Sequence, residues 1–119
     1  MEERLQKALE FANYRQTLNN QLHKAKIKAE GALMYAKNGG QFKVDQSLIC
    51  FLDFLIRTGH KDANLLDDND SPVNIDNLED FLKDITGRYF EVTNDYLREY
   101  QSIRKSRNVK SILDLKVDE

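Results

Sequence analysis

Apolar residues recur every three or four positions over the first third of the chain, which predicts one long helix from Glu2 to Lys37. The segment contains no Pro and is rich in Ala, Leu, Gln, Lys and Glu, which favour helices. Steps of three and four residues are the heptad period of a helix that packs along a partner helix. This first seam consists of Ala8, Phe11, Arg15, Leu18, Leu22, Ala25, Ala29, Ala32 and Ala36.

The residues after this helix have the pattern of a small mixed segment. Asn38-Gly39-Gly40 is expected to stop the helix, because glycine readily adopts the positive φ of a helix C-terminus. The alternating residues 41–44 predict a strand, and Asp45 or Ser47 is expected to cap a helix over residues 46–58. That helix is apolar around more than half of its circumference, which predicts burial between other elements.

Two short apolar runs follow, residues 64–66 and 72–75, on either side of the turn-rich residues 67–71. This arrangement predicts a β-hairpin. Pro72 is expected at the start or at the edge of a strand, because proline cannot donate to the ladder.

The last third of the chain has the pattern of another long helix, residues 77–107. Asp76 in the cap position and Glu79 three residues on predict its start. A second seam with heptad steps runs along it. The tail, residues 108–119, extends this helix or lies as a separate segment. The second seam consists of Leu78, Leu82, Ile85, Tyr89, Val92, Tyr96, Glu99 and Ile103.

The elements together predict a mainly α (α+β) fold in one domain, residues 1–119. Two long antiparallel helices, residues 1–37 and 77–107, bracket a strand–helix–hairpin insert over residues 41–75. The tail, residues 108–119, completes the domain.

The length of the first helix predicts self-association. A helix of about 36 residues is about 54 Å long, whereas a compact globule of this chain length is about 35 Å across. A break near Asn19-Asn20, which would give a compact monomeric bundle, is the alternative. With an unbroken helix we expect a homo-oligomer with coiled-coil-like packing through Leu18, Leu22, Ala25, Ala29, Leu82, Tyr89, Val92 and Tyr96.

Composition excludes several classes of protein. The chain has 119 residues, of which 40% are hydrophobic, with one Cys and a net charge of −2. No apolar run is long enough to span a membrane, and the N-terminus has no secretory pattern. A single Cys forms no internal disulfide framework, so we expect a cytoplasmic protein.

Charge is segregated along the chain. Residues 21–43 and 98–110 each carry a net charge of +4, whereas residues 62–84 carry −7. The simple explanation of this charge segregation is that the charged residues lie on solvated helix faces. The alternative is that the basic segments contact a phosphate backbone. Aromatic residues near the basic helix end could stack on single-stranded nucleic acid, although Tyr89 and Tyr96 fall on the second seam. The candidate phosphate contacts are Arg98, Arg104, Lys105, Arg107 and Lys110, with Lys24, Lys26 and Lys28.

No residue pattern predicts catalysis, a metal or a cofactor. Cys50 lies among apolar neighbours, which predicts a buried, inert thiol, and neither His has ligand spacing. A calcium loop counted from Asp67 would have Pro72 and Leu78 in place of its Gly and Glu. Counted from Asp68, Glu79 fits the end but Pro72 falls at a ligand position, so a polar hairpin turn is expected. Asp53 and Arg57 are spaced for an ion pair along one helix face. We therefore expect no enzymatic activity.

Several segments of the chain resemble a group of phage proteins. They are Gly39-Gly40-Gln41-Phe42, residues 78–85, residues 91–100, Arg104-Lys105-Ser106-Arg107 and residues 109–113. The sequences of these segments are similar to those of small proteins of contractile-tail bacteriophages, especially marine ones. The resemblance implies a bacterial host cytoplasm and carries over no catalytic residues. The function predicted is protein interaction or structural assembly, with a nucleic-acid-associated accessory protein as the alternative.

Overall fold

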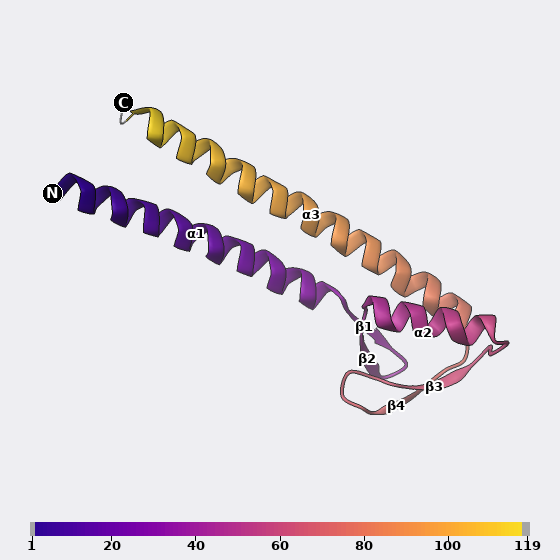
Figure 1. The fold of residues 1–119 in the computed structure, drawn as a ribbon. Coiled ribbons are helices and arrows are strands. Elements are labelled where there is room, and N and C mark those ends of the chain that lie inside the picture. Colours follow the sequence, from indigo (N-terminus) through magenta and orange to yellow (C-terminus); the bar gives the residue numbers. More distant parts are fainter. Residues whose placement is uncertain (1, 118–119) are drawn as a thin grey trace. The chain divides into compact units, whose positions relative to one another are not determined.

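The structure, a computed structural model, describes the backbone of residues 2–117 and the side chains of residues 2–106. It is mainly helical with two small antiparallel hairpins, which confirms the predicted α+β class. The chain forms two compact units. One, the α/β unit, is residues 29–94, and the other, the helix pair, is the described part of residues 1–28 and 95–119. The elements are α1 (Glu2–Ala32), β1 (Met34–Lys37), β2 (Gly40–Lys43), α2 (Gln46–Arg57), β3 (Ala63–Leu66), β4 (Pro72–Ile75) and α3 (Leu78–Val117) (Figure 1).

The prediction that the first helix reaches Lys37 is wrong, because α1 ends at Ala32 and residues 34–37 form β1. β1 pairs with β2 across a two-residue turn, Asn38-Gly39, in which both residues have positive φ, 50° and 83°. Such a turn follows the natural twist of a hairpin, and Asn-Gly is its preferred sequence. The side chain of Asn38 also donates a hydrogen bond to the carbonyl of Asn74, at 2.8 Å. Asn-Gly therefore makes a hairpin here where a helix stop was expected.

The second hairpin agrees with its prediction. β3 and β4 pair antiparallel, with Leu66 opposite Pro72, and Pro72 opens its strand as expected. The acidic residues between the strands form the predicted polar turn. It is closed by a hydrogen bond from the Asp67 N–H to the Ser71 carbonyl, at 3.0 Å.

The start of α2 is capped by Asp45, whose carboxylate accepts a hydrogen bond from the Leu48 N–H at 2.8 Å. This confirms one of the two predicted caps. The predicted ion pair between Asp53 and Arg57 is present as well, with an N–O distance of 3.0 Å. Helix α2 ends at Arg57, one residue earlier than expected.

The start of α3 differs by one residue from the prediction. Asn77, not Asp76, supplies the capping oxygen, which accepts a hydrogen bond from the Asp80 N–H at 3.1 Å. This hydrogen bond satisfies a backbone N–H that the first helical turn leaves open. The Asn77 side chain in turn donates to the Asp80 carboxylate at 2.9 Å.

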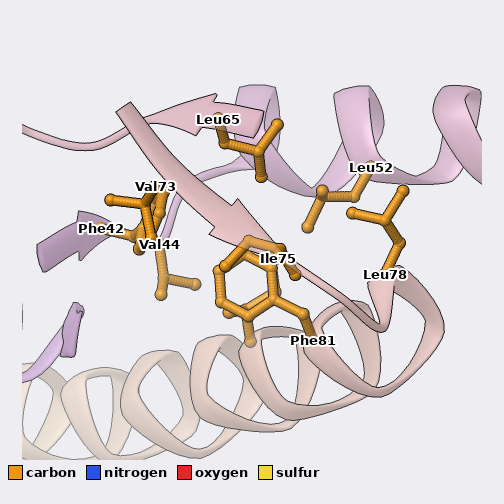
Figure 2. Close-up of a cluster of buried hydrophobic side chains, with 9 residues drawn as sticks. Phe42, Val44, Leu52, Leu65, Val73, Ile75, Leu78 and Phe81 are labelled. Carbon is orange, nitrogen blue, oxygen red and sulfur yellow. The ribbon is translucent and has the colours of Figure 1, made fainter. Parts of the chain in front are cut away.

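The α/β unit has one hydrophobic core (Figure 2). Side chains from both hairpins, from α2 and from the start of α3 meet in it. The rings of Phe42 and Phe81 lie edge to face with centroids 5.2 Å apart, a favoured aromatic geometry. The fully buried large side chains are Phe42, Phe81, Leu52, Ile75, Leu78, Ile85 and Val44.

The helix pair has a much smaller core. Ala25 of α1 is 2% exposed, and it is the only buried hydrophobic side chain among the described residues of this unit. Lys28 and Glu99 form an ion pair across the two helices at 3.8 Å. Small alanine side chains let two helices approach closely, which explains why this contact is centred on Ala25.

Candidate functional site

The first seam faces α3 only along part of its length. Ala25 and Ala29 are buried, and Leu18 and Leu22 are half-buried. Towards the N-terminus the same row is uncovered, because Ala8, Phe11 and Arg15 are exposed. The predicted packing residues of α1 are therefore used within the chain, and no side chain among residues 2–106 covers the N-terminal part of the row.

The four predicted packing residues of α3 are divided between the two units. Leu82, Tyr89 and Val92 belong to the α/β unit, and only Tyr96 belongs to the helix pair. Leu82 and Tyr89 pack against the core of the α/β unit, and the Tyr89 hydroxyl accepts a hydrogen bond from Gln46 at 3.1 Å. The heptad spacing thus located a buried face correctly, but the N-terminal part of that face holds α2 and the hairpins.

Two of the three described candidate phosphate contacts on α3 interact with neighbouring side chains. Arg98 forms an ion pair with Asp95. The guanidinium of Arg104 lies 5.7 Å from the centre of the Tyr100 ring, and Lys105 is exposed. The two remaining candidate phosphate contacts, Arg107 and Lys110, lie outside the residues whose side chains are described.

Helix α1 carries a second row of side chains, which the sequence analysis missed. We call it the outer row; it lies on the side of α1 opposite the first seam, because helical residues share a face at three- and four-residue steps. Every member is exposed and none is acidic, Lys or Arg, although α1 as a whole is rich in charge. The outer row consists of Leu5, Leu9, Ala12, Gln16, Asn20, His23 and Ile27.

Large apolar side chains in the outer row are open to solvent. Leu5 is 63% exposed and Leu9 is 56% exposed, and Ile27 is similarly open. The signal in the sequence was the absence of charge at these positions. The alanine-rich row of the first seam is longer and follows the heptad spacing strictly, so it drew attention away from this signal.

Helix α2 is buried on one side only, so the prediction of burial between other elements is wrong. Leu52 is its one fully buried residue, whereas Phe51 and Phe54 are exposed. Cys50 is exposed too, and the prediction of a buried thiol is therefore also wrong. The reason is geometric: Cys50 and Phe54 lie on the opposite side of the helix from Leu52.

The carboxyl group of Asp67 has a pKa that its surroundings displace. Its carboxylate accepts hydrogen bonds from the N–H groups of Ser71, Gln41 and Asn69, at 2.9, 3.1 and 2.9 Å. These bonds, led by that from Ser71, favour the ionised form and lower the pKa of Asp67 below its ordinary value of 3.8, against the opposing effect of burial. Asp67 therefore has a structural task, because it orders its own turn and ties it to β2.

Metal-binding geometry is absent from the described part of the chain. Among those residues, no group of three or more His, Cys, Asp and Glu side chains converges on a point that could hold a metal ion. One surface depression of about 270 Å³ lies near the start of α3, lined by Lys61, Asp76, Asn77 and Glu79. The backbone there is already engaged, since the Leu78 N–H donates to the Lys61 carbonyl at 3.0 Å.

Comparison with known proteins finds no match to this chain among family models, curated proteins or solved structures. Within residues 2–117, no helix is both long enough and apolar enough to cross a bilayer. The outer row of α1 and the exposed end of the first seam are therefore the features from which a function can be argued.

Proposed function

We propose that the chain is a non-enzymatic protein-interaction or assembly protein that self-associates through its helices. One observation carries the proposal: the helix pair buries a single hydrophobic side chain among its described residues, while five large ones stay more than half exposed. Two helices alone form one layer, and such a layer needs another to bury its apolar side chains. The five are Leu5, Leu9, Phe11, Ile27 and Leu97.

The non-enzymatic part of the proposal rests on what the charged side chains do. Asp53, Asp95 and Glu99 each form an ion pair with a basic residue, and Asp67 is engaged by backbone N–H groups. These interactions support local structure. The resemblance to proteins of contractile-tail bacteriophages supports assembly in an infected bacterial cell as the setting.

The test is size-exclusion chromatography with multi-angle light scattering on the full chain, at low and at high salt. We expect a defined oligomer for the natural sequence. Leu5→Lys combined with Leu9→Lys should shift it towards monomer, because each lysine places a charge in an apolar contact. Both positions are exposed, so the monomer should keep its helical circular dichroism.

The matched control adds two lysines to the same helix at exposed polar positions, Asn13→Lys with Thr17→Lys. This variant should elute with the natural protein. A natural chain that stays monomeric at high concentration would contradict the proposal, and so would an equal effect of the two double variants.

A nucleic-acid-associated accessory role is the second candidate. It is favoured by the aromatic and cationic side chains on α3: Arg104 lies over Tyr100, and the Tyr100 ring is edge to face with Tyr96 at 6.3 Å. The pairing of Arg98 with Asp95 weighs against it. Titration with single-stranded and duplex oligonucleotides tests this role. Binding that weakens steeply with salt and is lost in Arg104→Ala with Lys105→Ala would support it.

A further inference from the structure

We propose that the outer row of α1 is the surface on which a second copy of this chain docks, with the two α1 helices antiparallel. The inference rests on the self-association proposed above and specifies its surface and its orientation. Leu5 of one copy would pack against Ile27 of the other, Leu9 against His23, and Ala12 against Asn20. The two-fold axis would pass between the two Gln16 side chains.

The first support is that the outer row has the pattern of a helix–helix contact but is exposed in the part of the chain whose side chains are described. Its members follow each other at steps of three and four residues, and all are exposed and uncharged at neutral pH, with His counted as neutral. The row spans about 33 Å of helix, from the 1.5 Å rise per residue. The steps repeat every eleven residues, a period that keeps one row of side chains facing a neighbouring helix.

The second support is that apolar residues lie at the two ends of the row and polar residues lie at its centre. Leu5 and Leu9 stand at one end and Ile27 stands at the other. Antiparallel packing brings the leucine end of one copy onto the isoleucine end of the other. It also brings the two Gln16 amides together, and each amide can donate to and accept from the other.

The third support is charge complementarity beside the row. Glu2 and Glu10 lie in the N-terminal part of α1, and Lys24 and Lys28 lie in its C-terminal part, on the same side of the row. Antiparallel pairing about Gln16 sets Glu10 near the Lys24 of the other copy, whereas Lys28 is already paired with Glu99 of its own chain. Parallel pairing would instead bring Lys24 beside Lys26 of the other copy, which is repulsive.

The experiment is disulfide cross-linking of the full chain in a Cys50→Ser background, with copper phenanthroline as the oxidant. Four variants are compared: Gln16→Cys, Leu5→Cys, Ile27→Cys, and the double variant with Leu5→Cys and Ile27→Cys. All three positions are exposed, so each variant should fold. Covalent dimer is measured on non-reducing gels.

We expect Gln16→Cys to cross-link efficiently, because the axis passes through this position. Leu5→Cys and Ile27→Cys should each stay uncross-linked when alone, whereas the double variant should give covalent dimer. Within one helix these two positions are about 33 Å apart, too far for a disulfide in the same chain. Arg15→Cys, an exposed neighbour on the side of the first seam, is the matched control and should cross-link poorly.

Each other outcome overturns the inference in a recognisable way. Cross-linking of Leu5→Cys alone and Ile27→Cys alone would mean parallel helices. No cross-linking of any outer-row variant, in a chain that light scattering shows to be oligomeric, would place the contact elsewhere and leave the proposed function standing. A natural chain that is monomeric in light scattering would contradict the proposed function itself.

Charge swapping gives an independent measurement of orientation. Lys24→Glu alone and Glu10→Lys alone should each raise the dimer dissociation constant by about three- to tenfold, as expected for loss of exposed ion pairs. The double variant, with Glu10→Lys and Lys24→Glu, should return it close to the natural value. Additive weakening in the double variant would contradict the antiparallel arrangement.

Discussion

The carboxylate of Asp67 accepts a hydrogen bond from the backbone N–H of Gln41 at 3.1 Å, and so joins the turn of the second hairpin to a strand of the first. The Asp68 N–H strengthens the connection by donating to the Gln41 carbonyl at 2.8 Å. Residues 26 positions apart are thereby held together at the edge of the core. The two hairpins form separate two-stranded sheets, and no strand of one pairs with a strand of the other. These hydrogen bonds therefore connect the hairpins where strand pairing does not.

Acid should weaken the α/β unit through Asp67. Its pKa is lower in the folded chain than its ordinary value of 3.8, so the folded state holds the ionised form more strongly than the unfolded state. The stabilisation is fully present above the unfolded pKa and is lost as the pH falls through the folded pKa. Urea unfolding between pH 7 and pH 2 measures it.

Two variants separate this effect from general acid destabilisation. Asp67→Asn should be less stable than the natural chain at pH 7, and its stability should fall less on acidification. Asp68→Asn, whose side chain is exposed, should follow the natural pH dependence. Parallel pH curves for the natural chain and Asp67→Asn would show that Asp67 is not responsible.

Two glycines should respond in opposite directions to alanine. A Cβ on Gly40 would lie 2.5 Å from the Cγ2 atom of Val73, which forces the hairpins apart. We expect Gly40→Ala to cost about 1–3 kcal/mol of unfolding free energy, as overpacking does. Gly31→Ala in α1 meets nothing within 4 Å and should gain about 0.5–1 kcal/mol. Chemical denaturation measures the unfolding free energy of both variants. A stabilised Gly40→Ala variant would disprove the close approach of Gly40 to Val73.

Adjacent leucines of β3 should differ sharply in their contribution to stability. Leu65 is 6% exposed and belongs to the core, whereas Leu66 is 65% exposed. Leu65→Ala should cost about 2–5 kcal/mol, because it leaves a cavity. Leu66→Ala should change stability by less than about 0.5 kcal/mol. Similar losses of stability for both variants would mean that Leu65 and Leu66 do not face the core and the solvent respectively.

The thiol of Cys50 should react with a thiol reagent in the folded protein, without denaturant, because it is exposed on α2. Cys50→Ser provides the blank, since the chain has a single Cys. A reaction that begins only in denaturant would mean that Cys50 is buried, as the sequence predicted.

Local patterns predicted the elements whose decisive interactions are close in sequence. The second hairpin, the Asp45 cap and the pair of Asp53 with Arg57 depend on residues at most twelve positions apart, and all three are confirmed. The first hairpin was missed because Met34–Lys37 continues the alanine row of α1, so its local turn signal, Asn38-Gly39, was interpreted as a helix stop. The packing of Tyr35 near Phe81, with ring centroids 6.0 Å apart, is a distant contact that spacing does not show.

The same limit applies to the candidate site. Spacing identified Ala25 and Tyr89 as residues of a packed face, and the structure has both at least half-buried. Spacing alone does not say which element covers a face. Tyr89 was therefore assigned to a helix seam, although its hydroxyl accepts a hydrogen bond from Gln46 of α2. For Cys50, apolar neighbours in sequence were mistaken for neighbours in space. The use of the outer row as a contact surface stays a prediction.

The hydrogen bond from Arg88 to the Ala32 carbonyl, at 3.3 Å, has a consequence for how the chain folds. Both residues belong to the α/β unit, which is continuous in sequence and compact. Once it has formed, the points where the chain leaves it are neighbours, and pairing of α1 with α3 no longer has to close a long loop. Loop closure is a main source of delay in forming distant contacts. The helix pair should therefore form last and rapidly, growing outwards from Ala25 towards the two chain ends.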